Sequence, residues 1–186
     1  MPRSPTGRPA DGALRVGLVS DSHGLHDPKL DALLAGCALV LHAGDVVKPA
    51  VLEAIAALAP VRAVRGNNDL GPALEGLPES IVVELGELTA LVVHDLGTRG
   101  RPAPAARALL ARHEPEVVVH GHSHRPAAAL VDGRLVVNPG SCGPRRFSLP
   151  RSAALLDVAG RRVRVTFFDL ARQHLAPLGA PFEAEL

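Results

Sequence analysis

Short apolar runs recur along the chain, and most of them end in a cluster of Asp, Asn or His. The first three runs are Leu14–Ser20, Ala38–His42 and Val61–Arg65. Apolar runs of this length, bounded by turn-forming residues, are typical of buried strands. Segments with helical patterning separate them, so this half of the chain indicates βαβαβ, the order typical of a parallel sheet with helices packed outside it.

Two helices are expected between these strands. Asp27 and Pro28 indicate a helix start, with Asp as the N-cap and Pro at the first helical position, so the first helix covers 29–34. The second helix covers 49–58. Its apolar residues recur at helical spacing and share one face: Val51, Leu52, Ile55 and Leu58.

The second half of the chain is mostly strand. Three pairs of runs flank short turn sequences and are expected to form hairpins: Ser80–Leu85 with Leu88–Val93, Ala127–Val131 with Leu135–Asn138, and Ser152–Asp157 with Arg161–Phe168. A helix over 105–113 and a buried strand over 116–120 lie between the first two pairs. The pattern therefore predicts an α/β (α+β) fold with a mixed sheet or two packed sheets.

The composition is that of one globular domain, over 14–176, with a disordered tail over 1–13 and an irregular tail over 177–186. Of the 186 residues 47% are hydrophobic, and the formal charge is +1, which argues against disorder and against nucleic acid as a partner. No apolar run approaches the roughly 18 residues that span a bilayer. With only two cysteines, a reducing, cytoplasmic location is expected.

Five of the strand ends carry residue types that bind metals. They are Asp21 and His23, Asp45, Asn67, His94, and His122 with His124. Strand ends at one edge of a sheet meet in space, and these ligand types suit Mn, Fe(II), Zn or Ni. Seven candidates are too many for one tetrahedral ion, whereas a pair of ions that share a carboxylate accounts for them. Such pairs catalyse displacement at phosphorus. The alternative, that these residues only form turns and caps, leaves the three His unexplained.

The ordered motifs resemble those of the calcineurin-like metallophosphoesterases. They read DSHG, HAGD, GNND, VHD and GHSH, then NPGSCGPRR, and the resemblance covers 16–168. Within that superfamily the chain is similar to the small bacterial and archaeal phosphodiesterase branch, which also includes Vps29. The resemblance implies a four-layer α/β/β/α sandwich of two mixed sheets, with metals at the strand ends.

The resemblance also implies a role for each matching residue. One metal would be held by Asp21, His23 and His124, the second by Asn67, His94 and His122, and Asp45 would bridge both. A hydroxide between the two ions would attack phosphorus in line. Manganese is the metal expected first, with Ni, Fe, Co and Zn as alternatives.

Other residues near these motifs have expected roles of their own. Asn68 stands where the family usually has His or Cys, so it can donate a hydrogen bond to substrate but cannot act as a general acid. Asp69 is expected to orient a neighbour, and Arg145 to contact substrate. Asp95 replaces the usual Gly, and its carboxylate would either face solvent or disfavour dianionic substrates. His120, by strand alternation, is expected in the core.

The expected function is a metal-dependent phosphoesterase, more a phosphodiesterase than a monoesterase, that acts on a small phosphate ester. Two alternatives stay open. One is a non-catalytic scaffold subunit of the Vps29 type, which the seven filled ligand positions disfavour. The other is a nucleotide or dinucleoside polyphosphate hydrolase, which usually carries longer insertions. A homodimer also stays open, because no residue identifies an interface.

Overall fold

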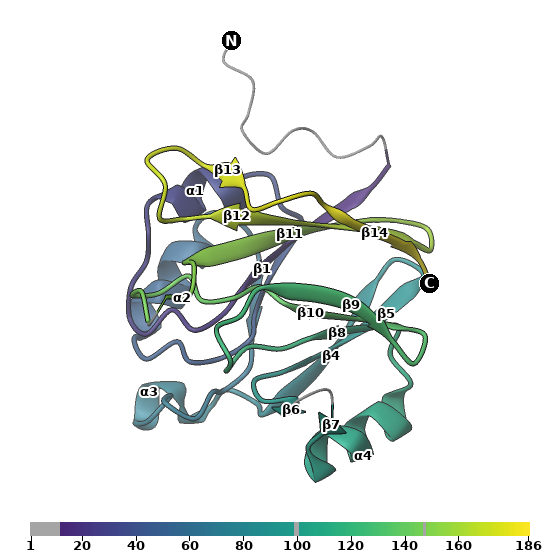
Figure 1. Cartoon of the computed structure of the whole chain (residues 1–186). Helices are drawn as coiled ribbons and strands as arrows, with labels where there is room; N and C mark the ends of the chain where they lie inside the picture. Colours follow the sequence, from purple (N-terminus) through teal and green to yellow (C-terminus); the bar gives the residue numbers. More distant parts are fainter. Residues whose placement is uncertain (1–11, 99–100, 147) are drawn as a thin grey trace.

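The computed structural model describes residues 12–98, 101–146 and 148–186, and it stacks two β-sheets face to face with helices outside them (Figure 1). The first sheet has the order β13-β12-β11-β1-β2-β3, with β14 also paired to β12. Its strands are β1 (Leu14–Val19), β2 (Leu39–His42), β3 (Val61–Ala63), β11 (Ser152–Ala159), β12 (Arg162–Asp169), β13 (Ala176–Pro177) and β14 (Phe182–Glu185).

The second sheet has the order β4-β5-β8-β10-β9. Its strands are β4 (Ser80–Leu85), β5 (Leu88–Val93), β8 (Val117–Val119), β9 (Ala127–Val131) and β10 (Arg134–Asn138). A small ribbon of β6 (Gly97–Thr98) and β7 (Arg101–Pro102) follows β5. Both sheets mix parallel and antiparallel pairs, so the expected sandwich of two mixed sheets is confirmed.

The helices cover the outer faces of the two sheets. They are α1 (Lys29–Leu34), α2 (Pro49–Ala56), α3 (Pro72–Glu75) and α4 (Pro104–His113). Helices α1 and α2 pack on the first sheet, and α4 lies on the outer side of the second (Figure 1). None of the helices within the described ranges is long and apolar enough to cross a membrane.

Two apolar layers hold the sandwich together. Between the sheets, Leu18 and Leu156 of the first sheet join the same buried cluster as Val119 and Val137 of the second. On the far side of the first sheet, apolar residues from three helices and four strands form another cluster, which includes Leu33, Ile55, Val40, Leu155 and Phe168. Strand alternation produces this division, because successive side chains point to opposite faces of a sheet.

The C-terminal segment was expected to be irregular, and this is wrong for 182–185. Here β14 pairs with β12 along its whole length. Phe182 and Ala184 pack toward the core between the sheets, whereas Glu183 and Glu185 face Arg164 and Arg162. A four-residue strand with two charged residues has too weak an apolar pattern to be recognised without its partner strand. The disordered tail was expected over 1–13, and its first eleven residues lie outside the described ranges.

The first helix covers the expected residues 29–34, but its N-cap lies one residue later than expected. Pro28 occupies the N-cap position, and Asp27 Oδ1 accepts a hydrogen bond from the Lys29 N–H at 2.9 Å. The carboxylate therefore still satisfies a free N–H at the helix start, although it stands one residue before the cap. Helix α3 and the β6–β7 ribbon were not expected, since each is too short to show a period.

Candidate metal centre

The parallel strands of both sheets deliver the predicted ligands to one end of the sandwich. Strands β1, β2 and β3 run parallel in the first sheet, as do β5, β8 and β10 in the second. The residues that follow β1, β2, β3, β5 and β8 include all seven predicted ligands. Their contacts with one another, described below, show that the five loops converge.

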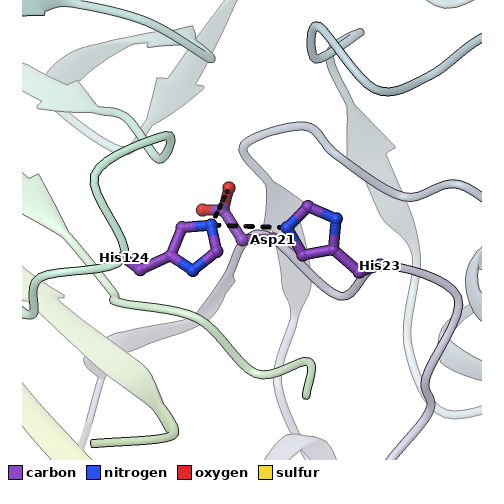
Figure 2. A group of neighbouring side chains, drawn as sticks. All are labelled: Asp21, His23 and His124. Carbon is purple, nitrogen blue, oxygen red and sulfur yellow. Dashed lines mark hydrogen bonds and ion pairs between the residues drawn. The ribbon is translucent and has the colours of Figure 1, made fainter. Parts of the chain in front are cut away.

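The first group consists of Asp21, His23 and His124 (Figure 2). His124 Nε2 lies 3.3 Å from His23 Nε2 and 3.2 Å from Asp21 Oδ1. Two imidazole nitrogens and a carboxylate oxygen therefore point at one small volume. At most one proton can lie between the two nitrogens, so at least one of them presents a lone pair there.

Asp21 is fully buried and is held in its charged form. Its Oδ2 accepts hydrogen bonds from the Ser20 hydroxyl at 2.6 Å and from the His122 N–H at 3.1 Å. Burial alone would raise the pKa of Asp21, but contacts with His124 and Ser20 outweigh it and hold the pKa below its ordinary value. The other oxygen, Oδ1, is buried and faces the group, where its polar neighbour is His124 Nε2 at 3.2 Å. A buried carboxylate oxygen that faces imidazole nitrogens is suited to binding a cation together with them.

The second group consists of Asn67, His94 and His122. The His94 Nδ1–H donates to the Ala43 carbonyl at 2.8 Å, so Nε2 carries the lone pair. That nitrogen lies 3.0 Å from Asn67 Oδ1, and His122 Nδ1 lies 3.0 Å from the same oxygen. The lone pairs of His94 Nε2 and Asn67 Oδ1 therefore face and repel each other, and a cation bound between these two atoms would remove the repulsion. A hydrogen bond from the other ring nitrogen to the backbone, as His94 has, is typical of metal-binding His.

Asp45 stands between the two groups. Its Oδ2 lies 3.8 Å from His23 Nε2, and its Oδ1 lies 3.5 Å from His94 Nε2. The side chain is almost fully buried, so its charge is poorly screened by water. One carboxylate oxygen faces each group, which is the arrangement that a bridging ligand needs. The donor set therefore fits a pair of divalent ions.

The backbone at these ligands is unusually strained. Of the eight non-glycine residues with positive φ in the described ranges, five are predicted ligands: Asp21, His23, Asp45, His122 and His124. A left-handed conformation costs roughly 1–2 kcal/mol for a residue with a side chain, and such residues cluster at functional sites. The fold therefore holds these side chains in place against a local preference for other conformations.

Close backbone approaches explain two of the glycines in the motifs. A Cβ at Gly66 would lie 2.2 Å from Asp45 Oδ1, and one at Gly121 would lie 1.9 Å from Ser20 Oγ. A side chain at position 66 would displace the carboxylate of Asp45, and one at position 121 would displace the Ser20 hydroxyl that holds Asp21. The glycines of GNND and GHSH are thus needed for space rather than for flexibility.

Asp69 and Asn138 hold the loops of the site in position. Asp69 is buried, and its two oxygens accept the N–H groups of Val47 and Gly66 at 2.7 Å each, which ties together the loops after β2 and β3. Asn138 Nδ2 donates to the Gly121 carbonyl at 2.7 Å and supports the GHSH loop. The contacts of Asp69 give it a positioning role.

The residues expected to meet substrate lie around the two groups. Asn68 donates from Nδ2 to Asp45 Oδ2 at 2.6 Å and from its N–H to Oδ1 at 2.8 Å, so its amide is engaged with the shared carboxylate. Arg145 is exposed and forms no hydrogen bond or ion pair with the described residues of this site. Burial lowers the pKa of His23, and the charge of the neighbouring Arg146 lowers it further. Asp95 is half exposed, and its Oδ2 lies 4.0 Å from His122 Nε2.

Two further histidines lie close to the centre. His42 is fully buried, and its Nε2 lies 3.1 Å from the Ser22 hydroxyl, behind the loop that carries Asp21 and His23. His120 was expected in the core, and this is wrong: it is only partly buried and lines a cavity beside His122. The strand β8 ends at Val119, so alternation no longer determines which way His120 points.

We expect the strained backbone at His122 to be measurable in the metal-free protein. His122 has φ +65° and a side chain that is 47% exposed, so its removal loses little packing. In chelator, His122→Gly should be more stable than His122→Ala by about 0.5–1 kcal/mol, because glycine adopts this conformation without strain. Urea unfolding of both variants measures the difference.

The matched control is Arg107→Gly against Arg107→Ala in the exposed face of α4. There the alanine variant should be the more stable by about 1 kcal/mol, because the position is helical. If His122→Ala were likewise more stable than His122→Gly, this result would contradict a strained backbone at position 122.

His42 should make the stability of the metal-free protein depend on pH. Burial lowers the pKa of His42 from 6.5 to about 4. The unfolded chain therefore binds a proton below pH 6.5 that the folded chain does not, and stability falls with pH until both forms are protonated below about pH 4. Between pH 7.5 and 5 the loss due to this group should be about 2 kcal/mol.

The measurement is the free energy of unfolding of the wild type and of His42→Leu across this range, in chelator. Leucine cannot titrate, and Ser22 can still donate to the Val46 carbonyl at 3.3 Å. As the pH falls, the wild type should lose more stability than His42→Leu. A difference that does not change with pH would show that His42 titrates normally.

Comparisons with known proteins identify the family to which the chain belongs. A model of the calcineurin-like phosphoesterase superfamily domain matches residues 14–161. A probable metallophosphoesterase of Methanothermobacter thermautotrophicus is 29% identical over 155 residues, which cover 80% of this chain and 88% of that protein. A phosphodiesterase of Methanocaldococcus jannaschii is 26% identical over 165 residues, which cover 81% of this chain and 97% of that protein.

The fold also matches solved structures. Vacuolar protein sorting 29 from Cryptosporidium parvum superimposes with a TM-score of 0.77 at 23% identity, covering 94% of this chain and 99% of that one. The likeness at this identity concerns the fold. The family model, which matches most of the chain, shows that the protein belongs to the calcineurin-like phosphoesterase superfamily.

Proposed function

We propose that the protein is a metal-dependent phosphodiesterase that uses two divalent ions. The observation that carries the proposal is the position of Asp45, whose two oxygens face His23 at 3.8 Å and His94 at 3.5 Å. The first ion would be held by Asp21, His23 and His124, and the second by Asn67, His94 and His122. When bound, such ions polarise phosphoryl oxygens and lower the pKa of a coordinated water.

The charge of the site suits a phosphodiester. Asp21 and Asp45 supply two negative charges against up to four positive charges from two divalent ions, and the remaining ligands are neutral. The loaded centre is therefore electropositive and attracts an anion, while its carboxylates are held in place by Ser20 and Asn68. Arg146, which lies near His23, adds a further positive charge.

Asp95 favours a diester over a monoester. Its half-exposed carboxylate lies 4.0 Å from the ring of His122, at the side of the second group. A monoester carries up to two negative charges near neutral pH and a diester carries one, so repulsion from Asp95 acts more strongly on the monoester. Asn68 cannot donate a proton as an acid, so the enzyme should prefer substrates with good leaving groups.

A scaffold role of the Vps29 type explains the fold but not the strained ligands. Five predicted ligands hold left-handed backbone conformations around buried carboxylates, which gains nothing for a protein that only docks partners. We therefore favour the enzyme. We also propose manganese as the native metal and a cytoplasmic location.

The test is hydrolysis of bis(p-nitrophenyl) phosphate by protein that has been stripped with chelator and then supplied with Mn²⁺. Activity should be absent after stripping and return with the metal. Asp45→Asn should lower the restored kcat by roughly 100-fold or more, because it weakens the ligand that both ions share. The control is Asp31→Asn, the same change on an exposed residue of α1, which should stay within about twofold of wild type.

The same preparations should hydrolyse p-nitrophenyl phosphate, a monoester with the same leaving group, more slowly. No turnover with Mn²⁺, Ni²⁺, Co²⁺ or Zn²⁺, although the metal is bound, would refute the enzyme and favour the scaffold. Equal loss of activity in Asp45→Asn and Asp31→Asn would refute the assignment of Asp45.

A further inference from the structure

A cavity of about 640 Å³ lies beside the metal centre, on the outer side of the second sheet. It lies under α4 and the β6–β7 ribbon, so it is separate from the space between the two sheets. Sites for small organic ligands usually have volumes of about 300–1,000 Å³. The cavity is thus large enough for a group of nucleoside size.

The walls of the cavity are mainly apolar. Its floor is the outer face of the second sheet, where Val118 and Val136 are neighbours across β8 and β10. Leu110 of α4, Pro102 of β7 and Val131 of β9 close the sides. A flat floor of branched side chains with an aliphatic cover suits a planar apolar group, which stacks on it and excludes water.

Three arginines also line the cavity: Arg101, Arg125 and Arg134. Within the described part of the chain none of them forms an ion pair with a carboxylate, although ion pairs are common elsewhere on the surface. Asp95 and Asp132 line the cavity as well, so the arginines outnumber the acidic residues by three to two. The balance of charge therefore favours an anionic group, and Arg binds phosphate well.

His122 connects the cavity to the metal centre. His122 lines the cavity, while its Nδ1 lies 3.0 Å from Asn67 Oδ1 in the second group of ligands. The adjoining His120 and Gly121 line the cavity too. A phosphodiester with its phosphorus at the metal centre would therefore reach the cavity with one of its two substituents by passing His122.

We infer that the cavity binds one substituent of the substrate, and that this substituent is a nucleoside which carries a further phosphate. The apolar floor would hold the base, and the three arginines would hold the extra phosphate. This inference rests on the proposed function for the position of the scissile phosphorus, but binding in the cavity itself needs no metal. A free nucleotide derivative is the source we assign, since the formal charge of +1 provides no basic track for a long strand.

The test uses Val136→Phe, which fills the cavity from its floor. The matched control is Val82→Phe on β4, because Val82 lies on the same outer face of the same sheet, is exposed, and does not line the cavity. Calorimetry in chelator with thymidine 3′,5′-bisphosphate should show binding to wild type and to Val82→Phe, and at least tenfold weaker binding to Val136→Phe. Arg134→Gln should weaken binding about tenfold, since it removes a charged hydrogen-bond donor.

The kinetic arm uses thymidine 5′-(p-nitrophenyl phosphate) with Mn²⁺. Val136→Phe should raise KM at least tenfold and leave kcat within about twofold, because the cavity binds the substrate away from the reacting atoms. Val82→Phe should change neither constant. Binding of the bisphosphate can be measured even if no ester is hydrolysed. Failure of the proposed function and failure of this inference are therefore distinct results.

Two results would overturn the inference. One is that Val136→Phe and Val82→Phe weaken binding of the bisphosphate equally, or that none of the proteins binds it. The other is binding of an eight-residue oligothymidylate more than tenfold tighter than the bisphosphate, which would assign the surface to a nucleic-acid strand instead.

Discussion

The rest of the site depends on the carboxylate of Asp45 and on its position between the two groups of ligands. It lies almost fully buried between two groups of ligands, and each of its oxygens faces one group. Two clusters of neutral imidazoles with only Asp21 for charge would have little affinity for a pair of divalent ions. In the proposed two-metal site, a second buried carboxylate shared between the groups would supply that charge without making the centre so negative that it repels a phosphate ester.

The strands and the buried side chains behind the loops hold the residues of this centre in place. Parallel strands in both sheets end on the same side, so loops that are far apart in the sequence meet there. Those loops cannot hold their ligands unaided, because several of the ligands have a left-handed backbone. Buried side chains behind them supply the missing constraint: Asp69 joins two loops through their N–H groups, and Asn138 supports a third. The apolar layer between the sheets fixes the distance between the strands that carry them.

The strands, the main helices and the convergence of the ligands could be predicted from the sequence because each has a local signal. Buried strands appear as apolar runs, and the ligands stand directly after them. The strand β14 could not be predicted, because its two glutamates are explained only by Arg162 and Arg164 on a strand some twenty residues earlier. The place of His120 was missed for a related reason, since the strand before it ends one residue sooner than its apolar run indicates. The cavity has no local signal at all, because its walls come from five strands, a helix and the loops between them.

The most direct measurement is the number and coupling of manganese ions that the stripped protein binds. After equilibration with Mn²⁺ and removal of the excess, elemental analysis should find two ions per chain. Electron paramagnetic resonance should show the multiline spectrum of an exchange-coupled pair, as expected for ions about 3.5–4 Å apart that share a carboxylate. One ion per chain, or two ions with the six-line spectrum of isolated Mn²⁺, would contradict a centre built around Asp45.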